Sequence, residues 1–331
     1  MTMATMKLPL KMYILILLGV SVMLYQYSLS SVIAFNGAPL DGADVLYRGT
    51  QNESMGHEAI KSGARRLDVA MALPVTTTAE SKLPMLYIIT PTYTRPEQVA
   101  ELTRLSHTLM LVPNLRWIVV EDATHKSPKV EAILAKSGLP YTHLIAPMPE
   151  EFKKKKKGPK PRGVSNRNKG LEWIRQNAKD GVLYFADDDN TYDLDIFEEM
   201  RHTRRVSMFP VGLITKLGVS SPVVRNGTFA GFYDGWIAGR KFPVDMAGFA
   251  VSVVFLHRRP NATMPYKPGY EEDGFLKSLR PFEPKEIELL ADKCTKILVW
   301  HTQTKKNEPS QPVDTSKYNN TNILTLKTIL V

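Results

Sequence analysis

The chain has 331 residues and a mass of 37.2 kDa, and its 43% hydrophobic, 23% charged and 9% aromatic residues exclude a collagen-like, coiled-coil or wholly disordered protein. The formal net charge is +10, but the run Lys153–Arg162 (KKKKKGPKPR) contributes seven positive charges, and subtracting these seven from +10 leaves +3. This distribution argues against a nucleic-acid-binding surface over the whole body. A single cysteine, Cys294, excludes an intramolecular disulfide framework and a cysteine-based zinc site, and its simplest role is a small buried apolar side chain.

The N-terminal region predicts a membrane anchor. Lys7 and Lys11 precede an uncharged stretch whose apolar part, residues 12–29, just reaches the roughly 17 to 25 residues that span a bilayer. A cleaved signal peptide is the alternative, but the cleavage signal is weak. The flanking charges place residues 1–11 in the cytosol and the rest of a type II protein in a lumen, and the short span suits a thin early-secretory membrane. Residues 30–83 lack a strong period and predict a lumenal stem.

Four Asn-x-Ser/Thr triplets agree with this orientation. Such triplets often arise by chance, so each means little alone. In a lumenal protein they become candidate glycosylation sites on surface loops. They begin at Asn52, Asn226, Asn261 and Asn319.

From Met85 onward, apolar runs alternate with helical patterns. The predicted strands are Leu86–Thr90, Arg116–Val120, Tyr141–Ile145 and Val182–Ala186. The predicted helices are Pro96–Met110, Lys129–Lys136 and Ser165–Ala178. This alternation predicts an α/β fold with a mostly parallel central sheet and helices on both faces. In such sheets, ligands bind at the carboxyl ends of the strands.

Acidic residues follow two of these strands. Asp122 follows the second predicted strand, and Asp187–Asp189 follow the fourth. Consecutive carboxylates repel one another, and a hard divalent cation that bridges to a diphosphate compensates such a cluster. The alternative is a solvated acidic turn before a helix expected at Asp193–His202. The chain has no G-x-G-x-x-G, Walker, H-E-x-x-H or G-x-S-x-G motif. A dinucleotide-binding oxidoreductase, a P-loop ATPase, a zinc protease and a serine hydrolase therefore lack their best sequence signals.

Basic residues surround the start of the third predicted helix. Arg162 lies just before that helix and Arg167 lies in its first turns, where a helix N-terminus flanked by arginines holds a diphosphate or a carboxylate. Arginines on an exposed helix face are the alternative. The preceding lysine run is interpreted as a solvated loop, with attraction of polyanionic acceptors or anionic lipid headgroups as the second possibility.

Two further features lie in the second half of the chain. Glu271, Glu272 and Asp273 include a candidate general base for an acceptor hydroxyl, and spacing alone does not rank the three. An acidic first turn of a helix explains them equally simply. His301 ends the predicted strand Ile297–Trp300, so its imidazole either touches phosphate or metal or packs as a structural histidine.

Eight short blocks occur in one order between about Met85 and Thr302. They are Pro91–Tyr93, Val120–Ala123, Pro161–Val164, Arg167–Lys169, Tyr184–Tyr192, Phe197–Arg201, Phe242–Ala250 and Leu298–Thr302. One block arises easily by chance, but eight in order do not. Together they closely resemble the animal β-1,3-glucuronosyltransferases, glycosyltransferase family 43.

The resemblance implies a GT-A nucleotide-sugar transferase fold and a Mn²⁺-dependent, inverting transfer of glucuronic acid from UDP-glucuronate to the 3-hydroxyl of a terminal galactose. It divides a catalytic domain at residues 84–331 into a donor half, about 84–190, and an acceptor half, about 191–331. The donor-binding positions matched by motif are Tyr93, Asp122, Arg162, Arg167, Asp187, Asp188 and His301. Asp189 matches the Mn²⁺ ligand and Glu272 the catalytic base. The acceptor-side positions are Trp236, Arg240 and Asp245.

The resemblance further implies a Golgi enzyme that forms a noncovalent homodimer, because the stem lacks the cysteine that links some relatives. The acceptor stays open between the Gal-Gal-Xyl linker of proteoglycans and an N-acetyllactosamine-type terminus of glycoproteins. Ser220 replaces a glutamate that contacts acceptor in the linker enzyme, and Gln303 replaces an arginine near the diphosphate. These departures keep one alternative function open, a catalytically weakened relative that binds UDP-sugars or glycans.

Overall fold

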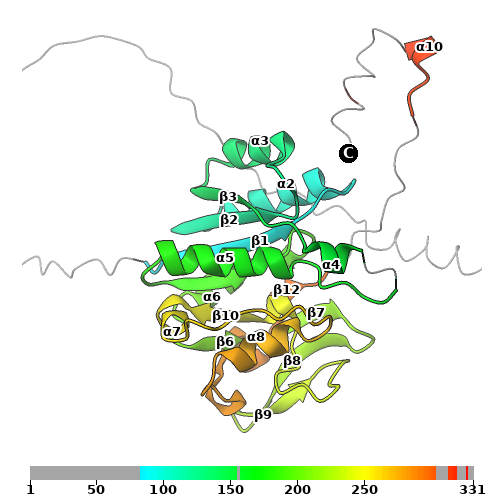
Figure 1. The fold of residues 1–331 in the computed structure, drawn as a ribbon. Helices are drawn as coiled ribbons and strands as arrows, with labels where there is room; N and C mark the ends of the chain where they lie inside the picture. The colour runs from blue at the N-terminus through cyan, green and yellow to red at the C-terminus, as the bar shows by residue number, and fades with distance from the viewer. Residues whose placement is uncertain (1–82, 155–156, 303–311, 319–325, 327–331) are drawn as a thin grey trace, which may run out of the picture. The chain divides into compact units, whose positions relative to one another are not determined.

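The computed structural model describes residues 83–154, 157–302, 312–318 and 326 (Figure 1). The predicted anchor, nearly all of the predicted stem, Asn52, Gln303 and Asn319 lie outside these residues. Within the part that is described, no helix is long and apolar enough to cross a membrane. Anchor, stem and domain boundaries therefore stay predictions.

A seven-stranded sheet forms the centre of the domain, in the order β11-β6-β10-β4-β1-β2-β3. Its strands are β1 (Leu86–Thr92), β2 (Leu115–Glu121), β3 (Tyr141–Ile145), β4 (Val182–Phe185), β6 (Val206–Met208), β10 (Phe249–Ser252) and β11 (Glu288–Leu289). β1 pairs in parallel with β2 and β4, and β2 with β3, as the sequence predicts. β10, which was not predicted, runs antiparallel to both β4 and β6. The sheet is thus mostly parallel.

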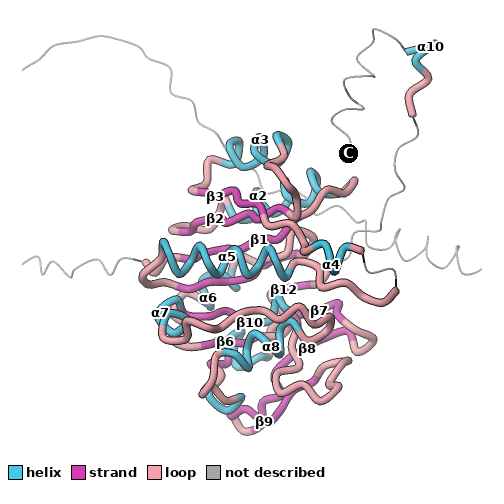
Figure 2. The backbone as a smooth tube through the Cα atoms, in the orientation of Figure 1, coloured by secondary structure: helices cyan, strands magenta, loops and turns pink. Residues whose placement is uncertain are grey.

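Helices cover both faces of this sheet, which confirms the expected layers (Figures 1 and 2). On one face, α5 (Val164–Asn177) packs Leu171 and Ile174 into the cluster that contains Ile89. On the other, α2 (Gln98–Leu109) and α3 (Pro128–Ser137) pack into the cluster that contains Ile88. Neighbouring strand residues enter different clusters because successive side chains point to opposite faces.

A second sheet, absent from the sequence prediction, has the order β5-β12-β7-β8-β9. Its strands are β5 (Thr191–Tyr192), β7 (Val211–Ile214), β8 (Gly218–Arg225), β9 (Thr228–Tyr233) and β12 (Val299–Trp300). β12 lies inside the predicted strand Ile297–Trp300 and is shorter than it, whereas β5 has two residues and was not predicted. The candidate glycosylation residue Asn226 lies exposed in the β8–β9 turn and Asn261 lies exposed in a loop, while glycosylation itself stays a prediction.

The remaining helices are short. They are α4 (Glu150–Lys153), α6 (Asp195–Met200), α7 (Val253–His257), α8 (Glu271–Ser278), α9 (Leu290–Cys294), α10 (Thr315–Tyr318) and the 3₁₀ turns Met246–Gly248 and Pro284–Glu286. α6 is shorter at both ends than the predicted Asp193–His202. Cys294 is half-buried, and burial raises the pKa of its thiol to about 12, which fits an unreactive side chain.

Candidate active site

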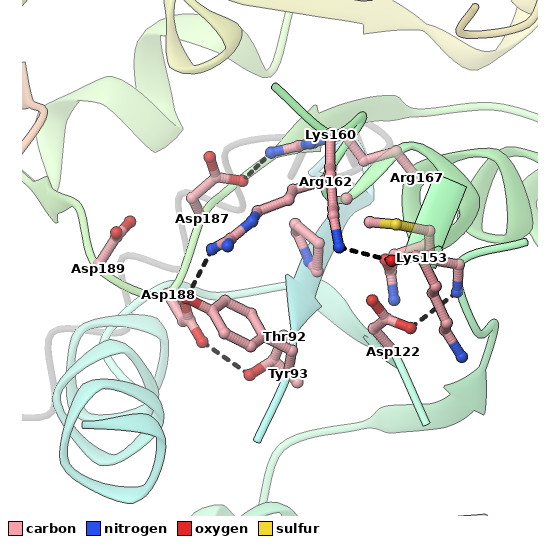
Figure 3. Close-up of a pocket in the computed structure, with 14 residues that line it drawn as sticks. Thr92, Tyr93, Asp122, Lys153, Lys160, Arg162, Arg167, Asp187, Asp188 and Asp189 are labelled. Atoms are coloured by element: carbon pink, nitrogen blue, oxygen red, sulfur yellow. Dashed lines mark hydrogen bonds and ion pairs between the residues drawn. The ribbon is translucent and has the colours of Figure 1, made fainter. Parts of the chain in front are cut away.

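A pocket of about 330 Å³ opens at the carboxyl ends of β1, β2 and β4 (Figure 3). Because β1 pairs in parallel with both other strands, residues that follow the three strands meet at one edge. The structure brings seven predicted residues to the walls of this pocket, and their chemical roles remain predictions. They are Tyr93, Asp122, Arg162, Arg167, Asp187, Asp188 and Asp189.

The three consecutive aspartates that follow β4 have different surroundings (Figure 3). Asp187 pairs with Arg167, with 2.5 Å between Oδ1 and Nη2. Asp188 is buried and pairs with Arg95, also at 2.5 Å. The carboxylate of Asp189 forms no ion pair with the described residues, and burial together with its two acidic neighbours raises its pKa to about 6. Two arginines therefore compensate two of the three charges.

The described residues fit a divalent cation only when another ligand joins them. None of them form a group of three His, Cys, Asp or Glu side chains that holds a metal ion by itself. Asp187 and Asp188 are committed to arginines, so Asp189 is the available ligand. Mg²⁺ and Mn²⁺ accept one or two carboxylates and complete their shells with phosphate oxygens and water. The donor set thus fits a metal ion that binds together with a diphosphate.

Arg95 does not line the pocket but contacts two residues that do, Tyr93 and Asp188, and it was not predicted from the sequence. Its guanidinium bridges Asp188 and Glu101 and also lies over the ring of Tyr93, 4.7 Å from the centroid. Thr92 Oγ1 donates a 2.7 Å hydrogen bond to the second oxygen of Asp188. The sequence signal that could have identified it is an arginine shortly after the end of β1, two residues beyond Tyr93. Arg95 thus ties Asp188, which follows β4, to the ring of Tyr93, which follows β1.

The N-terminus of α5 supplies Arg162 and Arg167. Gly163, which lies between them, has a φ of +74°, and a Cβ at this position would lie 2.4 Å from Arg167 Nη1. The positive φ favours glycine, and a larger residue here would displace the end of the Arg167 side chain. Arg167 is buried and interacts electrostatically with Glu272 in the second half of the domain. Arg162 lies over the ring of Tyr93 at 5.7 Å, so two guanidinium groups flank this exposed ring.

Two lysines of the basic run line the same pocket. Lys153 and Lys160 are half-buried, and Lys160 Nζ donates a 2.6 Å hydrogen bond to the carbonyl of Lys153 (Figure 3). Lys154 and Lys157 are exposed, as expected for a solvated loop. The run therefore combines solvated residues with residues that face the pocket.

The end of β2 is held by a buried charged cluster. Asp122 accepts a 2.7 Å hydrogen bond from the backbone N–H of Met148. The preceding Glu121 is fully buried, 2.9 Å from Nε2 of His143, whose Nδ1 lies 2.7 Å from Glu131. The two carboxylates raise the pKa of His143 against the opposing effect of burial. The imidazole of His143, held between two carboxylates, thus braces the strand end that carries Asp122.

The structure separates the three acids that spacing did not rank. Asp273 is buried, and its Oδ1 accepts hydrogen bonds from the backbone N–H groups of Lys241 at 2.7 Å and Phe242 at 3.0 Å. Its other oxygen pairs with Lys277 at 2.6 Å, so Asp273 is structural. Burial raises the pKa of Glu272 to about 7, which suits a general base.

Glu272 belongs to a charged group that joins the two halves of the domain. The charge of Asp245 adds to the raised pKa of Glu272, whereas Arg167 lowers it. His301 lies at the end of β12, where its N–H donates to the carbonyl of Gly212 at 2.9 Å. It is absent from the pocket wall, but its charge opposes the raised pKa values of both Asp189 and Asp245. His301 is therefore close enough to Asp189 and to Asp245 to influence both carboxylates.

The predicted acceptor-side residues Trp236 and Arg240 lie on the loop after β9. Trp236 is 49% exposed, and its ring lies 6.3 Å from that of Tyr270, directly before α8. Arg240 lies over the Trp236 ring at 5.6 Å and pairs with Asp234 at 3.0 Å. Ser220 is 2% exposed and donates a 2.5 Å hydrogen bond to the same carboxylate. Asp234, which no sequence pattern indicated, thus organises this loop.

Comparison with known proteins gives one family. The profile of glycosyltransferase family 43 matches residues 105–305. Galactosylgalactosylxylosylprotein 3-beta-glucuronosyltransferase P of Drosophila melanogaster is 62% identical over 256 residues, covering 77% of this chain and 53% of that protein. The fly protein named with the suffix S is 52% identical over 72% of this chain and 58% of that protein. Human galactosylgalactosylxylosylprotein 3-beta-glucuronosyltransferase 2 is 48% identical over 71% of this chain and 75% of that protein. The chain thus spans little more than half the length of the two fly relatives.

Proposed function

Because the chain belongs to glycosyltransferase family 43, we propose that it transfers glucuronic acid from UDP-glucuronate to the 3-hydroxyl of a terminal galactose, with inversion. The names of its relatives support this proposal. The observation that carries it is the position of Glu272, whose pKa is about 7 and whose charge interacts with Arg167 on the pocket wall. This position supports a general base beside a pocket that accepts a nucleotide.

The pocket supplies groups for each part of a uridine diphosphate. The Tyr93 ring is exposed and suits stacking on a base, and the carboxylate of Asp122 suits a base N–H donor. Arg162 and Arg167 present guanidinium groups that match phosphate or carboxylate oxygens in a bidentate manner. Asp188 is fixed by Arg95 and is proposed to contact ribose.

We propose Mn²⁺ as the cofactor and Asp189 as its protein ligand. When bound, the ion supplies positive charge that stabilises the leaving diphosphate. The residues of the chain contribute in the same sense, because Arg167 places a further positive charge beside Asp187, and His301 is proposed to contact the diphosphate. The raised pKa of Asp189 fits a carboxylate whose charge is compensated only when a cation is present.

The proposed reaction is a single displacement. Glu272 removes the proton of the acceptor hydroxyl, the new bond from this oxygen to C1 of the glucuronosyl group forms, and the bond from C1 to the diphosphate oxygen breaks. The electron pair of the broken bond leaves with UDP. Attack from the opposite side inverts C1, so no enzyme nucleophile is needed. Trp236, Arg240 and Asp245 are proposed to hold the acceptor beside Glu272.

The fold type, the localisation and the oligomeric state belong to the same proposal. The mixed α/β domain is proposed to have the GT-A fold, and the chain to be a type II Golgi membrane protein that acts as a noncovalent homodimer. The buried hydroxyl of Ser220, bound to Asp234, leaves the acceptor open between the proteoglycan linker and an N-acetyllactosamine-type terminus.

Release of UDP by the purified chain tests the proposal. The assay combines UDP-glucuronate and Mn²⁺ with Galβ1-3Gal or Galβ1-4GlcNAc, and EDTA and Glu272→Ala serve as controls. We expect release that requires acceptor and disappears in both controls, and the preferred disaccharide identifies the acceptor class. Tight UDP binding without release on either acceptor would instead support a UDP-sugar-binding or glycan-binding protein.

A further inference from the structure

The edge of the central sheet that lies opposite the proposed active site carries a concentrated positive charge. β10 runs antiparallel to β4, so that Ser252 at its end pairs with Val182 at the start of β4. α7, which follows directly after β10, therefore lies at the amino edge of β4, whereas the pocket follows the carboxyl edge (Figure 1). This positive region is thus separate from the catalytic residues proposed above.

Two neighbouring hollows form this region, which we name the arginine surface. The first has a volume of about 530 Å³, and its charged lining residues are Arg204, Arg205, Arg258, Arg259, Arg280 and Glu286. The second has a volume of about 550 Å³ and is lined by Arg175, Lys179, His257 and Arg258, among others. Both hollows include Val254 and Arg258, so they share a wall.

The positive charge of the arginine surface is only partly compensated. Its carboxylate, Glu286, pairs with Arg205 at 2.5 Å. Arg204, Arg258 and Arg280 form no ion pair with the described residues, and all three are exposed. The mutual repulsion is visible at Arg259, whose pKa is lowered by burial and by the charges of Arg258 and Arg205. An anion in the hollows relieves this repulsion.

We propose that the arginine surface binds an acidic polysaccharide through sulfate or carboxylate groups that enter the two hollows. Guanidinium groups match such oxyanions with two parallel hydrogen bonds, and arginines outnumber lysines on this surface. Two adjacent recesses suit a linear chain with repeated charges, whereas a flat bilayer reaches only their rims. The choice of a polysaccharide rests on the proposed function, because transfer of glucuronic acid makes acidic glycans.

Binding of heparin to the full chain in neutral detergent tests this proposal without donor or metal ion. We compare the chain with the triple variant Arg204→Gln, Arg258→Gln, Arg280→Gln. A charge-matched control carries Lys136→Gln, Lys216→Gln and Arg225→Gln, which change exposed residues elsewhere. Loss of three oxyanion contacts is expected to weaken heparin binding about tenfold or more, against about twofold or less in the control.

Two further measurements separate this site from its alternatives. A variant with Lys154→Gln and Lys157→Gln tests the basic run, and vesicles with 30% phosphatidylserine test a membrane surface. Equal heparin affinity of the arginine variant and the control overturns the proposal, as does loss confined to the lysine variant or binding to vesicles but not to heparin. UDP release on a disaccharide is measured in parallel and is expected to stay unchanged in the arginine variant, so failure of the proposed reaction is recognised separately.

Discussion

The nucleotide pocket and the loop that carries Trp236 are stabilised in different ways. At the pocket, the charge compensation is distributed over several residues, because Arg167 pairs with Asp187 and Arg95 bridges Asp188 and Glu101. In the loop, the single carboxylate of Asp234 pairs with Arg240 and accepts a 2.7 Å hydrogen bond from the backbone N–H of Trp236. A single substitution at the pocket is therefore expected to leave other charge contacts in place, whereas the loop depends on the one carboxylate of Asp234.

The largest effect is expected at Glu272, which lies where the two regions meet. Glu272→Gln removes the proposed base, and we expect kcat to fall by about 10² to 10⁴ while UDP binding is retained. Glu271→Gln is the matched control in the same helical turn and is expected to lower kcat less than about tenfold. Steady-state kinetics together with calorimetric titration of UDP separate the two effects. A parallel loss of UDP binding would argue that Glu272 serves the pocket rather than the reaction.

The pH profile sharpens the assignment of Glu272. A base must be deprotonated to accept a proton, and burial raises the pKa of Glu272 to about 7. We therefore expect kcat to rise as pH increases through about 7 and to level off above it. The residual rate of Glu272→Gln is expected to lack this rise, measured between pH 5.5 and 8.5 in buffers of constant ionic strength.

Two aspartates of the pocket can be compared directly, because Asp187 forms an ion pair with Arg167 and Asp189 forms none with the described residues. Asp189→Asn is expected to abolish the increase in UDP affinity that Mn²⁺ provides, whereas Asp187→Asn is expected to keep it. The free energy of unfolding is expected to increase in Asp189→Asn and to decrease in Asp187→Asn. The folded pKa of Asp189, about 6, lies above its ordinary value of 3.8, so its charge destabilises the metal-free fold increasingly from pH 3.8 upward and fully above about 6.

Melting temperatures of the two variants, measured at pH 7.5 without metal, test these opposite effects on stability. Asp189→Asn is expected to raise the melting temperature by a few degrees, because it removes the unfavourable charge. Asp187→Asn is expected to lower it, because Arg167 is buried and loses its carboxylate partner. A decrease in both variants would show that Asp189 is compensated in the fold without a metal ion.

A smaller effect is expected in the loop. Asp234→Asn leaves Arg240 without its ion pair, and we expect the acceptor KM to increase about tenfold while the KM for UDP-glucuronate stays within about twofold. Ser220→Ala removes one hydrogen bond to the same carboxylate and is expected to have a weaker effect on the same constant. Equal changes in both KM values would contradict the independence of loop and pocket.

The sequence predicted the parallel part of the fold because apolar runs mark β1, β2, β3 and β4, each of four to seven residues. It predicted the strand that becomes β12 but missed β10 and the rest of the second sheet, because these strands pair antiparallel and lack the strand–helix alternation that marks the first four. It placed the pocket correctly because parallel strand ends meet at one edge. Arg95 escaped notice because its partner Asp188 lies 93 positions away in the chain. The acceptor-side residues came from family resemblance alone, as a loop gives no periodic pattern.

The mildest test concerns the cluster that braces β2 beneath the pocket. The folded pKa of His143 lies above its ordinary value of 6.5, so its stabilising charge is fully present below pH 6.5 and is lost as pH rises through the folded value. The pKa of Glu121 is lowered from 4.5, because hydrogen bonds from His143 and Ser127 outweigh burial, so its contribution is lost only as pH falls below 4.5. The cluster is thus strongest between about pH 4.5 and 6.5.

His143→Gln tests this window through the melting temperature at pH 5.5, 7.5 and 9. The variant keeps one hydrogen bond but loses the positive charge, so we expect a decrease of a few degrees at pH 5.5 that shrinks as pH rises, because the wild type then loses the same charge. His107→Gln changes an exposed histidine and serves as the matched control. A decrease that is equal at all three pH values would mean that His143 stabilises β2 by packing alone. A pH-dependent decrease instead means that the charge of His143, shared by Glu121 and Glu131, supports the strand end that carries Asp122.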